Sequence, residues 1–152
     1  MGNYATARLL TDRELFAWRG FLRAHTALTR ELDAELLAAH GLPLTSYEVL
    51  LFLADAPGGR MRMSELAESV LLSRSGLTRL ADRLAGYGLI ERAQCTEDAR
   101  GWFAAITPKG REVFDEARKT HLDGVRRLFV GSFSQDELET LGSCLERLAP
   151  AA

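Results

Sequence analysis

Hydrophobic residues recur at helical spacing through both ends of the chain. Within residues 11–40, apolar side chains return every three or four positions until Gly41, where glycine can take the left-handed conformation that ends a helix. Residues 108–148 repeat the same spacing in two further segments. Both ends of the chain are therefore predicted to be helical, with one long helix at the start and two helices at the end.

The predicted helices begin at recognisable capping residues. A hydroxyl side chain just before a helix can accept a hydrogen bond from a backbone N–H that the first turn leaves unpaired. The positions with this character are Thr11, Thr45, Ser73, Thr107 and Ser134. Of these, Thr11, Thr45 and Ser134 stand three residues before a glutamate, which is the spacing of a capping box. Ser64 is a further predicted helix start.

The middle of the chain changes from helical spacing to short strands. A helix is predicted from Ser73 to Gly88, and the segments 89–94 and 102–106 have the length and the β-branched or aromatic content of two strands. A polar turn, 96–101, joins them into a hairpin. The predicted fold is mainly α with a small β-hairpin. It consists of a winged helix-turn-helix lobe over 45–107 and a helical region formed by 11–40 and 108–148. A small core cannot bury all the leucine and phenylalanine side chains of that helical region, so we expect it to be a dimerisation region.

Composition is consistent with one globular domain. The chain has 152 residues, of which 47% are hydrophobic and 26% are charged. No apolar run reaches the length of about 20 residues that a membrane span needs, and the first residues lack the features of a signal peptide. We therefore expect a cytoplasmic protein with no membrane partner.

Cysteine and histidine are sparse. The residues in question are Cys95, Cys144, His25, His40 and His121, and none has the sequence spacing of a zinc site. Neither a metal nor a cofactor is expected. Cys95 enters the predicted hairpin and is interpreted as a plain strand residue, although its oxidation could displace the neighbouring turn.

Basic residues concentrate in the middle segment. Residues 60–111 contain nine basic and six acidic side chains, a net charge of +3, whereas the whole chain has a formal charge of −2. The remainder therefore carries −5. This distribution suits a protein that presents one face to a polyanion, and a solvated face of mixed charge would look similar.

The predicted helix-turn-helix places particular side chains where DNA would lie. The second helix of such a motif enters the major groove, and its N-terminal residues meet base edges. The residues in that position are Arg74, Ser75, Thr78 and Arg79. At the hairpin tip, Arg100 could probe an adjacent minor groove while Asp98 holds its guanidinium. The alternatives are an exposed amphipathic face and a surface ion pair. Arg83, one turn further along, could pair with Asp82 or Glu68.

Two stretches resemble the MarR family of transcriptional regulators. Residues 64–92, "SELAESVLLSRSGLTRLADRLAGYGLIER", resemble the helix-turn-helix core of that family, and residues 98–107, "DARGWFAAIT", resemble its wing signature. The resemblance extends from about residue 11 to residue 148. Gly76 departs from it by lowering helix propensity early in the recognition helix.

The resemblance implies a homodimer that binds a pseudo-palindromic stretch of double-stranded DNA and represses transcription. It also implies a small aromatic or phenolic effector that releases DNA from a crevice beside the dimerisation helices. We expect that crevice near Trp18, His25 and Tyr47. Trp18 and His25 could equally belong to the dimer core.

An enzyme and a protein-binding module are the two other classes of protein to consider. Enzyme motifs such as GxSxG, HExxH and GxxxxGK are absent from the sequence, so no catalytic residues are expected. A winged-helix module that binds another protein is the stronger alternative. Sequence-selective DNA binding would separate it from a regulator.

Overall fold

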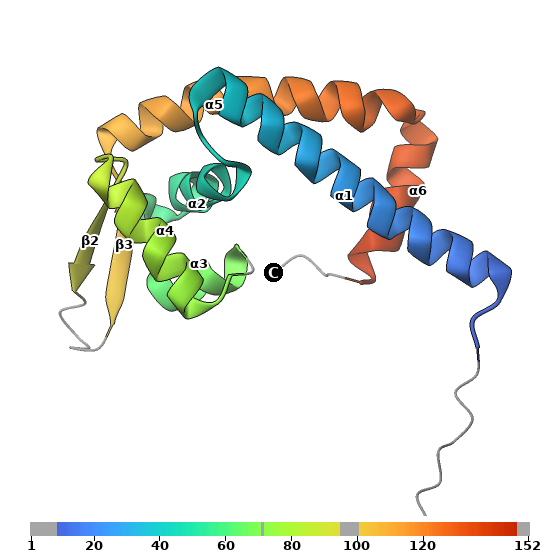
Figure 1. The fold of residues 1–152 in the computed structure, drawn as a ribbon, viewed down its shortest axis with the longest axis horizontal. Helices are drawn as coiled ribbons and strands as arrows, with labels where there is room; N and C mark the ends of the chain where they lie inside the picture. The colour runs from blue at the N-terminus through green and yellow to red at the C-terminus, as the bar shows by residue number, and fades with distance from the viewer. Residues whose placement is uncertain (1–8, 71, 95–100, 149–152) are drawn as a thin grey trace, which may run out of the picture.

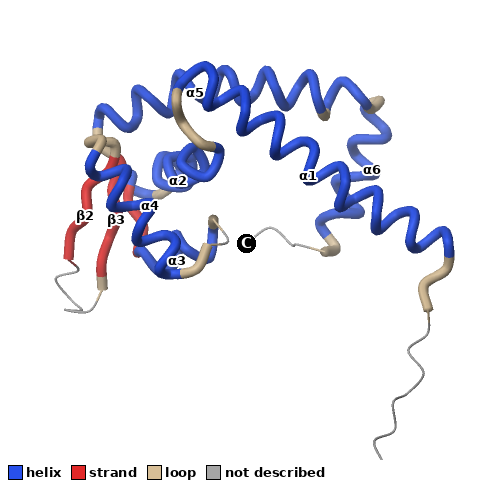
Figure 2. Tube along the Cα trace, in the orientation of Figure 1, coloured by secondary structure: helices blue, strands red, loops and turns tan. Residues whose placement is uncertain are grey.

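The structure, a computed structural model, describes residues 9–70, 72–94 and 101–148. Helices dominate, and the strands form one small sheet (Figure 1, Figure 2). In chain order the elements are α1 (Asp12–His40), α2 (Leu44–Asp55), a 3₁₀ turn (Pro57–Gly59), β1 (Arg60–Arg62), α3 (Met63–Ser69), α4 (Arg74–Gly86), β2 (Ile90–Gln94), β3 (Trp102–Ile106), α5 (Pro108–Leu128), a second 3₁₀ turn (Val130–Ser132) and α6 (Gln135–Glu146). The mainly helical fold class predicted from the sequence is confirmed.

Four predicted helix starts are also confirmed. Each capping hydroxyl accepts a hydrogen bond from the backbone N–H three residues later, which satisfies a donor that the helix leaves free. The capping residues are Thr11, Ser73, Thr107 and Ser134. The third helix begins at Met63, one residue before the predicted Ser64.

The capping box predicted at Thr45 is wrong. Helix α2 already begins at Leu44, after Pro43, which has no side-chain group to cap it. The carboxylate of Asp33 in α1 accepts a hydrogen bond from the Leu44 N–H at 2.7 Å instead. Ser46, a member of the predicted box, is buried. A residue eleven positions away therefore caps this helix.

The sheet has three strands, one more than the predicted hairpin. Strand β3 lies in the centre and pairs antiparallel with both β1 and β2. Within β1, Arg62 is opposite Phe103, and within β2, Arg92 is opposite Ala104. The additional strand, β1, lies at the edge of the sheet beside β3.

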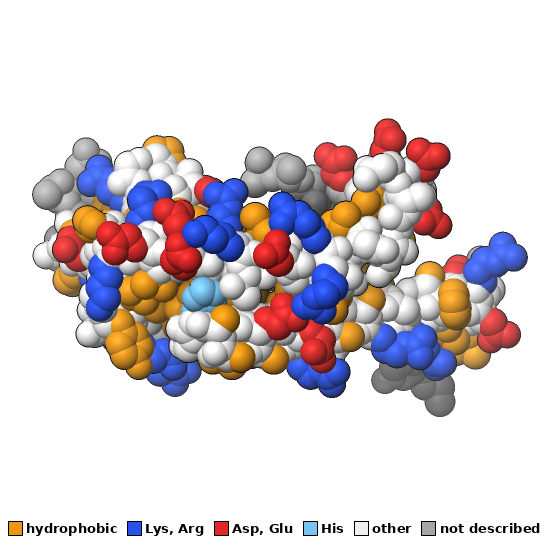
Figure 3. Space-filling view, turned by 90° about the horizontal axis from the view of Figure 1, so that it is seen from above, with side chains coloured by type: hydrophobic (Ala, Val, Ile, Leu, Met, Phe, Trp, Pro, Cys, Tyr) orange, Lys and Arg blue, Asp and Glu red, His pale blue; other side chains and the backbone are white. Residues whose placement is uncertain are grey.

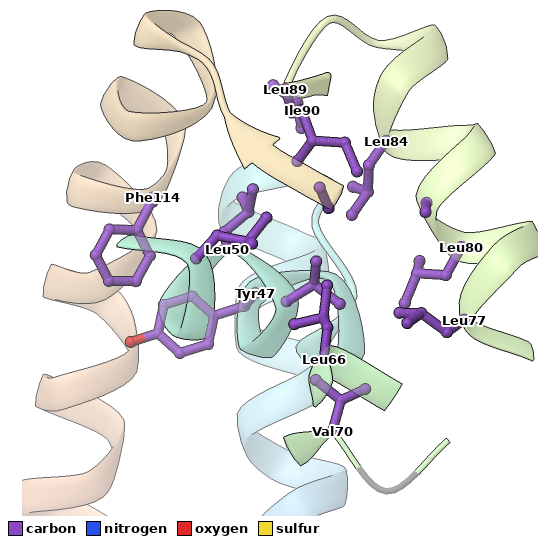
Figure 4. Close-up of a cluster of buried hydrophobic side chains, with 14 of the residues drawn as sticks. Tyr47, Leu50, Leu66, Val70, Leu77, Leu80, Leu84, Leu89, Ile90 and Phe114 are labelled. Atoms are coloured by element: carbon purple, nitrogen blue, oxygen red, sulfur yellow. The ribbon is translucent and has the colours of Figure 1, made fainter. Parts of the chain in front are cut away.

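The hydrophobic core lies inside the lobe formed by α2, α3, α4 and the sheet. Figure 4 shows leucines of α2, α3 and α4 meeting side chains of the sheet and of α5. Tyr47 and Phe114 stack at one edge of this cluster, with ring centroids 5.5 Å apart. The lobe is consequently built on α5, which continues out of it.

Helices α1, α5 and α6 extend away from the lobe (Figure 1). The C-terminal half of α1 packs on α5, where His40 Nε2 lies 2.7 Å from the Thr120 hydroxyl and Glu35 pairs with Arg127. Figure 3 shows acidic and basic side chains intermingled on the side that α1 and α5 form, with hydrophobic side chains exposed between them. That side has no predominant charge.

Within the described residues, no single helix has both the length and the hydropathy of a membrane span. Helices α1 and α2 pass that test only as a pair, and they meet at an angle of 84°.

Candidate nucleic-acid interface

Helix α4 exposes the residues that the sequence predicts for DNA contact. Its buried positions are Leu77, Leu80, Ala81 and Leu84, which hold one side of the helix against the core. The opposite side is exposed and carries Arg74, Ser75, Thr78 and Arg79. The predicted orientation of this helix is therefore confirmed, and the four side chains share one solvent-facing surface near its N-terminus.

The hydroxyl groups of this surface are partly committed to the backbone. Thr78 Oγ1 donates to the carbonyl oxygen of Arg74 at 2.9 Å, so its remaining capacity is that of an acceptor. Ser75 Oγ lies 3.3 Å from Ser73 Oγ, beside the helix cap. Among the residues that the structure describes, Arg74 and Arg79 form no ion pair. Within that part of the chain, no carboxylate competes with a phosphate or a base edge for either guanidinium group.

The strands add further cations beside aromatic rings. The guanidinium carbons of Arg60 and Arg62 lie 5.3 and 5.4 Å from the centre of the Phe103 ring. On β2, the guanidinium of Arg92 lies over Trp102 at 5.3 Å. Such contacts restrain the arginine side chains while their charge stays near the surface. From the sequence these arginines are recognisable as part of the basic middle segment, but not as members of the site.

A basic groove separates α4 from the sheet. Its volume is about 340 Å³, and its described lining contains no acidic residue. The polar residues that line it are Arg62, Ser64, Arg74, Thr78 and Arg92, and Trp102 forms an apolar wall. Arginines from three different elements thus border this groove. The strand register places the Arg62 side chain on the face of Phe103, and the Arg92 side chain on the face of Ala104 and Trp102. Arg62, close to the start of a predicted helix, and Arg92, followed by the aromatic pair Trp102 and Phe103, are the sequence signal that could have located it.

The predicted wing-tip residues Asp98 and Arg100 lie outside the described residues, as does Cys95. Their roles remain predictions from the sequence.

A second concave surface is apolar and lies between α1, the second 3₁₀ turn and α6. It has a volume of about 740 Å³. Trp18 and His25 line it from α1, with Phe21 between them at ring-centroid distances of 6.3 and 6.5 Å. Leu141 and Leu145 line it from α6. We call this surface the α1–α6 groove.

Tyr47 does not share the α1–α6 groove with Trp18 and His25. Its side chain is only 2% exposed and packs against Phe114 and His121 of α5. Burial raises the pKa of the Tyr47 hydroxyl, an effect that the nearby charge of Arg118 opposes. The three predicted effector residues are therefore divided between a groove and the core.

Two ionisable groups near Tyr47 are perturbed by burial. Burial raises the pKa of the Glu48 carboxyl, and the positive charge of His25 acts against this shift. Burial lowers the pKa of His121, whose Nδ1 has no hydrogen-bond partner among the described atoms. Across the described residues, no group of three or more His, Cys, Asp or Glu side chains could hold a metal ion.

The chain resembles known regulators over nearly its whole length. The model of the MarR family matches residues 40–101. AbsC, a MarR family transcriptional regulator from Streptomyces coelicolor, is 36% identical in sequence, with 93% of this chain and 95% of that chain covered and a TM-score of 0.87. The chain belongs to the MarR family.

Two further relatives are a regulator with a structure in complex with DNA and a transcriptional repressor. Sco3205, a MarR family regulator from Streptomyces coelicolor with a structure in complex with DNA, is 34% identical over 93% of this chain and 89% of that chain, with a TM-score of 0.88. The transcriptional repressor YetL of Bacillus subtilis is 28% identical over 74% of this chain and 69% of its own length. In this MarR family member, α4 corresponds to the predicted recognition helix, and the sheet contains both strands of the predicted wing hairpin.

Proposed function

We propose that this MarR family protein is a sequence-specific DNA-binding transcriptional regulator that represses its target genes. The observation that carries the proposal is the basic groove between the exposed face of α4 and the wing. An α-helix fits the major groove of B-DNA, and cations beside it can neutralise the flanking phosphates. The relatives described as a DNA complex and as a repressor support the same assignment.

The residues proposed to contact DNA differ in what they would recognise. Arg74 and Arg79 lie near the start of α4 and can reach base edges or adjacent phosphates. Ser75 and Thr78 share their surface and offer hydroxyl groups. At the wing tip, Arg100 is proposed to read groove shape and charge, with Asp98 orienting it.

Binding to DNA from upstream of the protein's own gene tests this function. Fluorescence anisotropy with that duplex and with a scrambled duplex should show selective binding that weakens steeply as salt rises. If the protein binds the upstream and the scrambled duplex equally, or binds neither, the proposal of sequence-specific binding to this DNA is contradicted. A winged-helix module that recognises only another protein would give that result.

The protein is further proposed to act as a homodimer. Helix α6 has no buried residue within the described chain, although Leu138, Leu141 and Leu145 form an apolar stripe along it. On α1, Phe16 is 76% exposed and Trp18 is 54% exposed. Apolar surface of this extent is typical of an interface, and a second copy of the chain would cover it. On these grounds we keep, as part of the proposal, the division into a DNA-binding lobe, 45–107, and a dimerisation region, 11–40 with 108–148.

A small aromatic or phenolic effector is an alternative occupant of the same α1–α6 groove, and the aromatic row on α1 favours it. Trp18, Phe21 and His25 line an apolar surface that includes one imidazole, which could hydrogen-bond a phenol. Tyr47 is buried against two side chains of α5, neither of which lines this groove, so it is not proposed to contact the effector. If an effector weakens DNA binding by a given factor, DNA must weaken effector binding by the same factor, because linkage is reciprocal. Titrating phenolic compounds against free and DNA-bound protein tests this relation.

A further inference from the structure

Arg92 connects the wing to the recognition helix. Its guanidinium pairs with the carboxylate of Asp82 on α4 and lies over the ring of Trp102 on β3, 5.3 Å from the ring centre. Asp82 was a sequence candidate to pair with its neighbour Arg83, but the structure pairs it with Arg92. One side chain therefore contacts both parts of the motif that are proposed to bind DNA.

The sheet register directs Arg92 toward α4. Arg92 is opposite Ala104, and Trp102 lies two residues before Ala104 on the same strand. Because alternate residues of a strand share a face, all three side chains lie on one face of the sheet. Ala104 is fully buried, so this face is the one that packs into the lobe.

The contact on α4 lies in line with the proposed DNA-binding residues. Arg74, Thr78 and Asp82 are spaced four residues apart, which places them in one row along the helix. The first two line the basic groove together with Arg92 and Trp102. The Asp82–Arg92 pair thus holds the C-terminal end of the row whose N-terminal end would meet DNA.

Two contacts orient the Arg92 guanidinium. Its Nε is buried and has no hydrogen-bond partner among the described atoms. The side chain is 25% exposed, whereas that of Asp82 is 59% exposed. An ion pair with one exposed partner contributes little by itself, but the flat face of Trp102 limits the orientations that the guanidinium can adopt. Loss of either contact should leave Arg92 loosely held.

We propose that Arg92 is a positioning residue that sets the spacing between the recognition helix and the wing through Asp82 and Trp102. The proposal rests on the DNA-binding function proposed above. If the spacing is held, the helix and the wing engage one DNA site together. When it is released, the helix still binds its base pairs, but the wing contributes less to affinity.

The test separates the wing contribution from the helix contribution. Wild type, Arg92→Lys and Asp82→Asn are compared on a full operator duplex and on one trimmed of the outer base pairs that the wing would reach. Trimming should weaken wild-type binding by about tenfold or more, and each variant should lose most of that dependence. Asp82→Asn, which does not line the basic groove, should bind the trimmed duplex like wild type. The double variant Arg92→Lys/Asp82→Asn should lose no more than either single variant. Circular dichroism melts establish that the variants are folded.

A fluorescence measurement reports the geometry without DNA. In a Trp18→Phe background, Trp102 is the only tryptophan, so the emission reports the guanidinium above its ring. Asp82→Asn should change this emission indirectly, because Asp82 pairs with Arg92 and the Arg92 guanidinium lies over the Trp102 ring. Glu91→Ala is the matched control, since alternation places its exposed side chain on the opposite face of β2. It should leave both the emission and the trimming effect unchanged.

The possible outcomes are distinct. If wild type binds no operator selectively, the proposed function fails and the positioning role fails with it. If wild type binds selectively and both single variants keep the full trimming effect, the positioning role alone is overturned. A variant that weakens full and trimmed duplexes equally would also overturn it, because that pattern indicates general destabilisation.

Discussion

The backbone of Gly110 lies directly against the carbonyl group of Leu89: a β-carbon placed on Gly110 would be 1.9 Å from the Leu89 oxygen. The same carbonyl accepts a hydrogen bond from the Thr107 N–H at 3.1 Å, and the Thr107 hydroxyl donates to the carbonyl of Gly88 at 2.6 Å. The start of α5 is thereby joined to the turn between α4 and β2. This contact connects the DNA-binding lobe to the helix that carries the proposed dimer interface.

Gly110→Ala should therefore destabilise the protein. No side chain fits in that space without backbone movement, so we expect a loss of about 1–3 kcal/mol or more in the free energy of unfolding. Urea unfolding followed by circular dichroism at fixed protein concentration measures the loss. Gly86→Ala is the control, because a β-carbon there meets no atom within 4 Å. Equal stabilities for the two variants would show that the Gly110 contact is looser than described.

Asp33→Ala should weaken the start of α2. The Asp33 carboxylate caps the Leu44 N–H, and loss of a capping group costs about 0.5–2 kcal/mol. Thr45→Ala is the informative control, since Thr45 is exposed and makes no cap to this helix. A larger loss for Thr45→Ala than for Asp33→Ala would restore the capping box that the sequence suggested.

Phe16→Glu should shift the protein from dimer toward monomer. The side chain is exposed within one chain and lines the α1–α6 groove, so a second copy would bury the new charge against apolar atoms. Light scattering at low micromolar concentration should give about twice the 16.8 kDa chain mass for wild type and a smaller mass for the variant. Tyr87→Glu, also at an exposed aromatic but on the lobe, should keep the wild-type mass. A monomeric wild type would remove the proposed interface.

His121 should make stability depend on pH. Burial lowers its pKa from an ordinary value near 6.5, so the unfolded chain binds a proton more readily than the folded protein. The free energy of unfolding should therefore decrease as pH falls from about 7.5 to 5.5. Burial of Glu48 acts in the opposite direction, with its raised pKa favouring the folded state at lower pH. Urea titrations at the two pH values should show a smaller decrease for His121→Phe than for wild type. An identical decrease would mean that other groups account for the dependence.

Replacing the arginines of α4 and replacing Arg100 of the wing should have different effects on DNA affinity and base preference. Arg100→Ala should weaken cognate and scrambled duplexes by similar factors and lower the salt slope by up to about 1 per subunit. If Arg74 or Arg79 makes a bidentate pair with guanine, its replacement by alanine should cost about 1–3 kcal/mol at that base pair and relax the preference there. Anisotropy titrations over several salt concentrations distinguish these patterns. Wild-type binding by Arg100→Ala on both duplexes would exclude the wing tip as a DNA probe.

The sequence by itself determined the features that depend on neighbouring residues. A capping hydroxyl and its target N–H are three residues apart, so Thr11, Ser73, Thr107 and Ser134 identify helix starts without knowledge of the fold. The same holds for the buried side of α4, since a period of 3.6 residues assigns its leucines to one face. The family resemblance rested on contiguous stretches for the same reason.

Only the tertiary structure decided the features that join distant segments. Asp33 caps α2 because the chain reverses between α1 and α2, and Asp82 pairs with Arg92 because β2 returns alongside α4. Tyr47 is buried because α5, more than sixty residues later in the chain, covers its ring with Phe114. Electrostatic and packing energies depend on distance in space, and residue spacing reports that distance only within a single helix or strand.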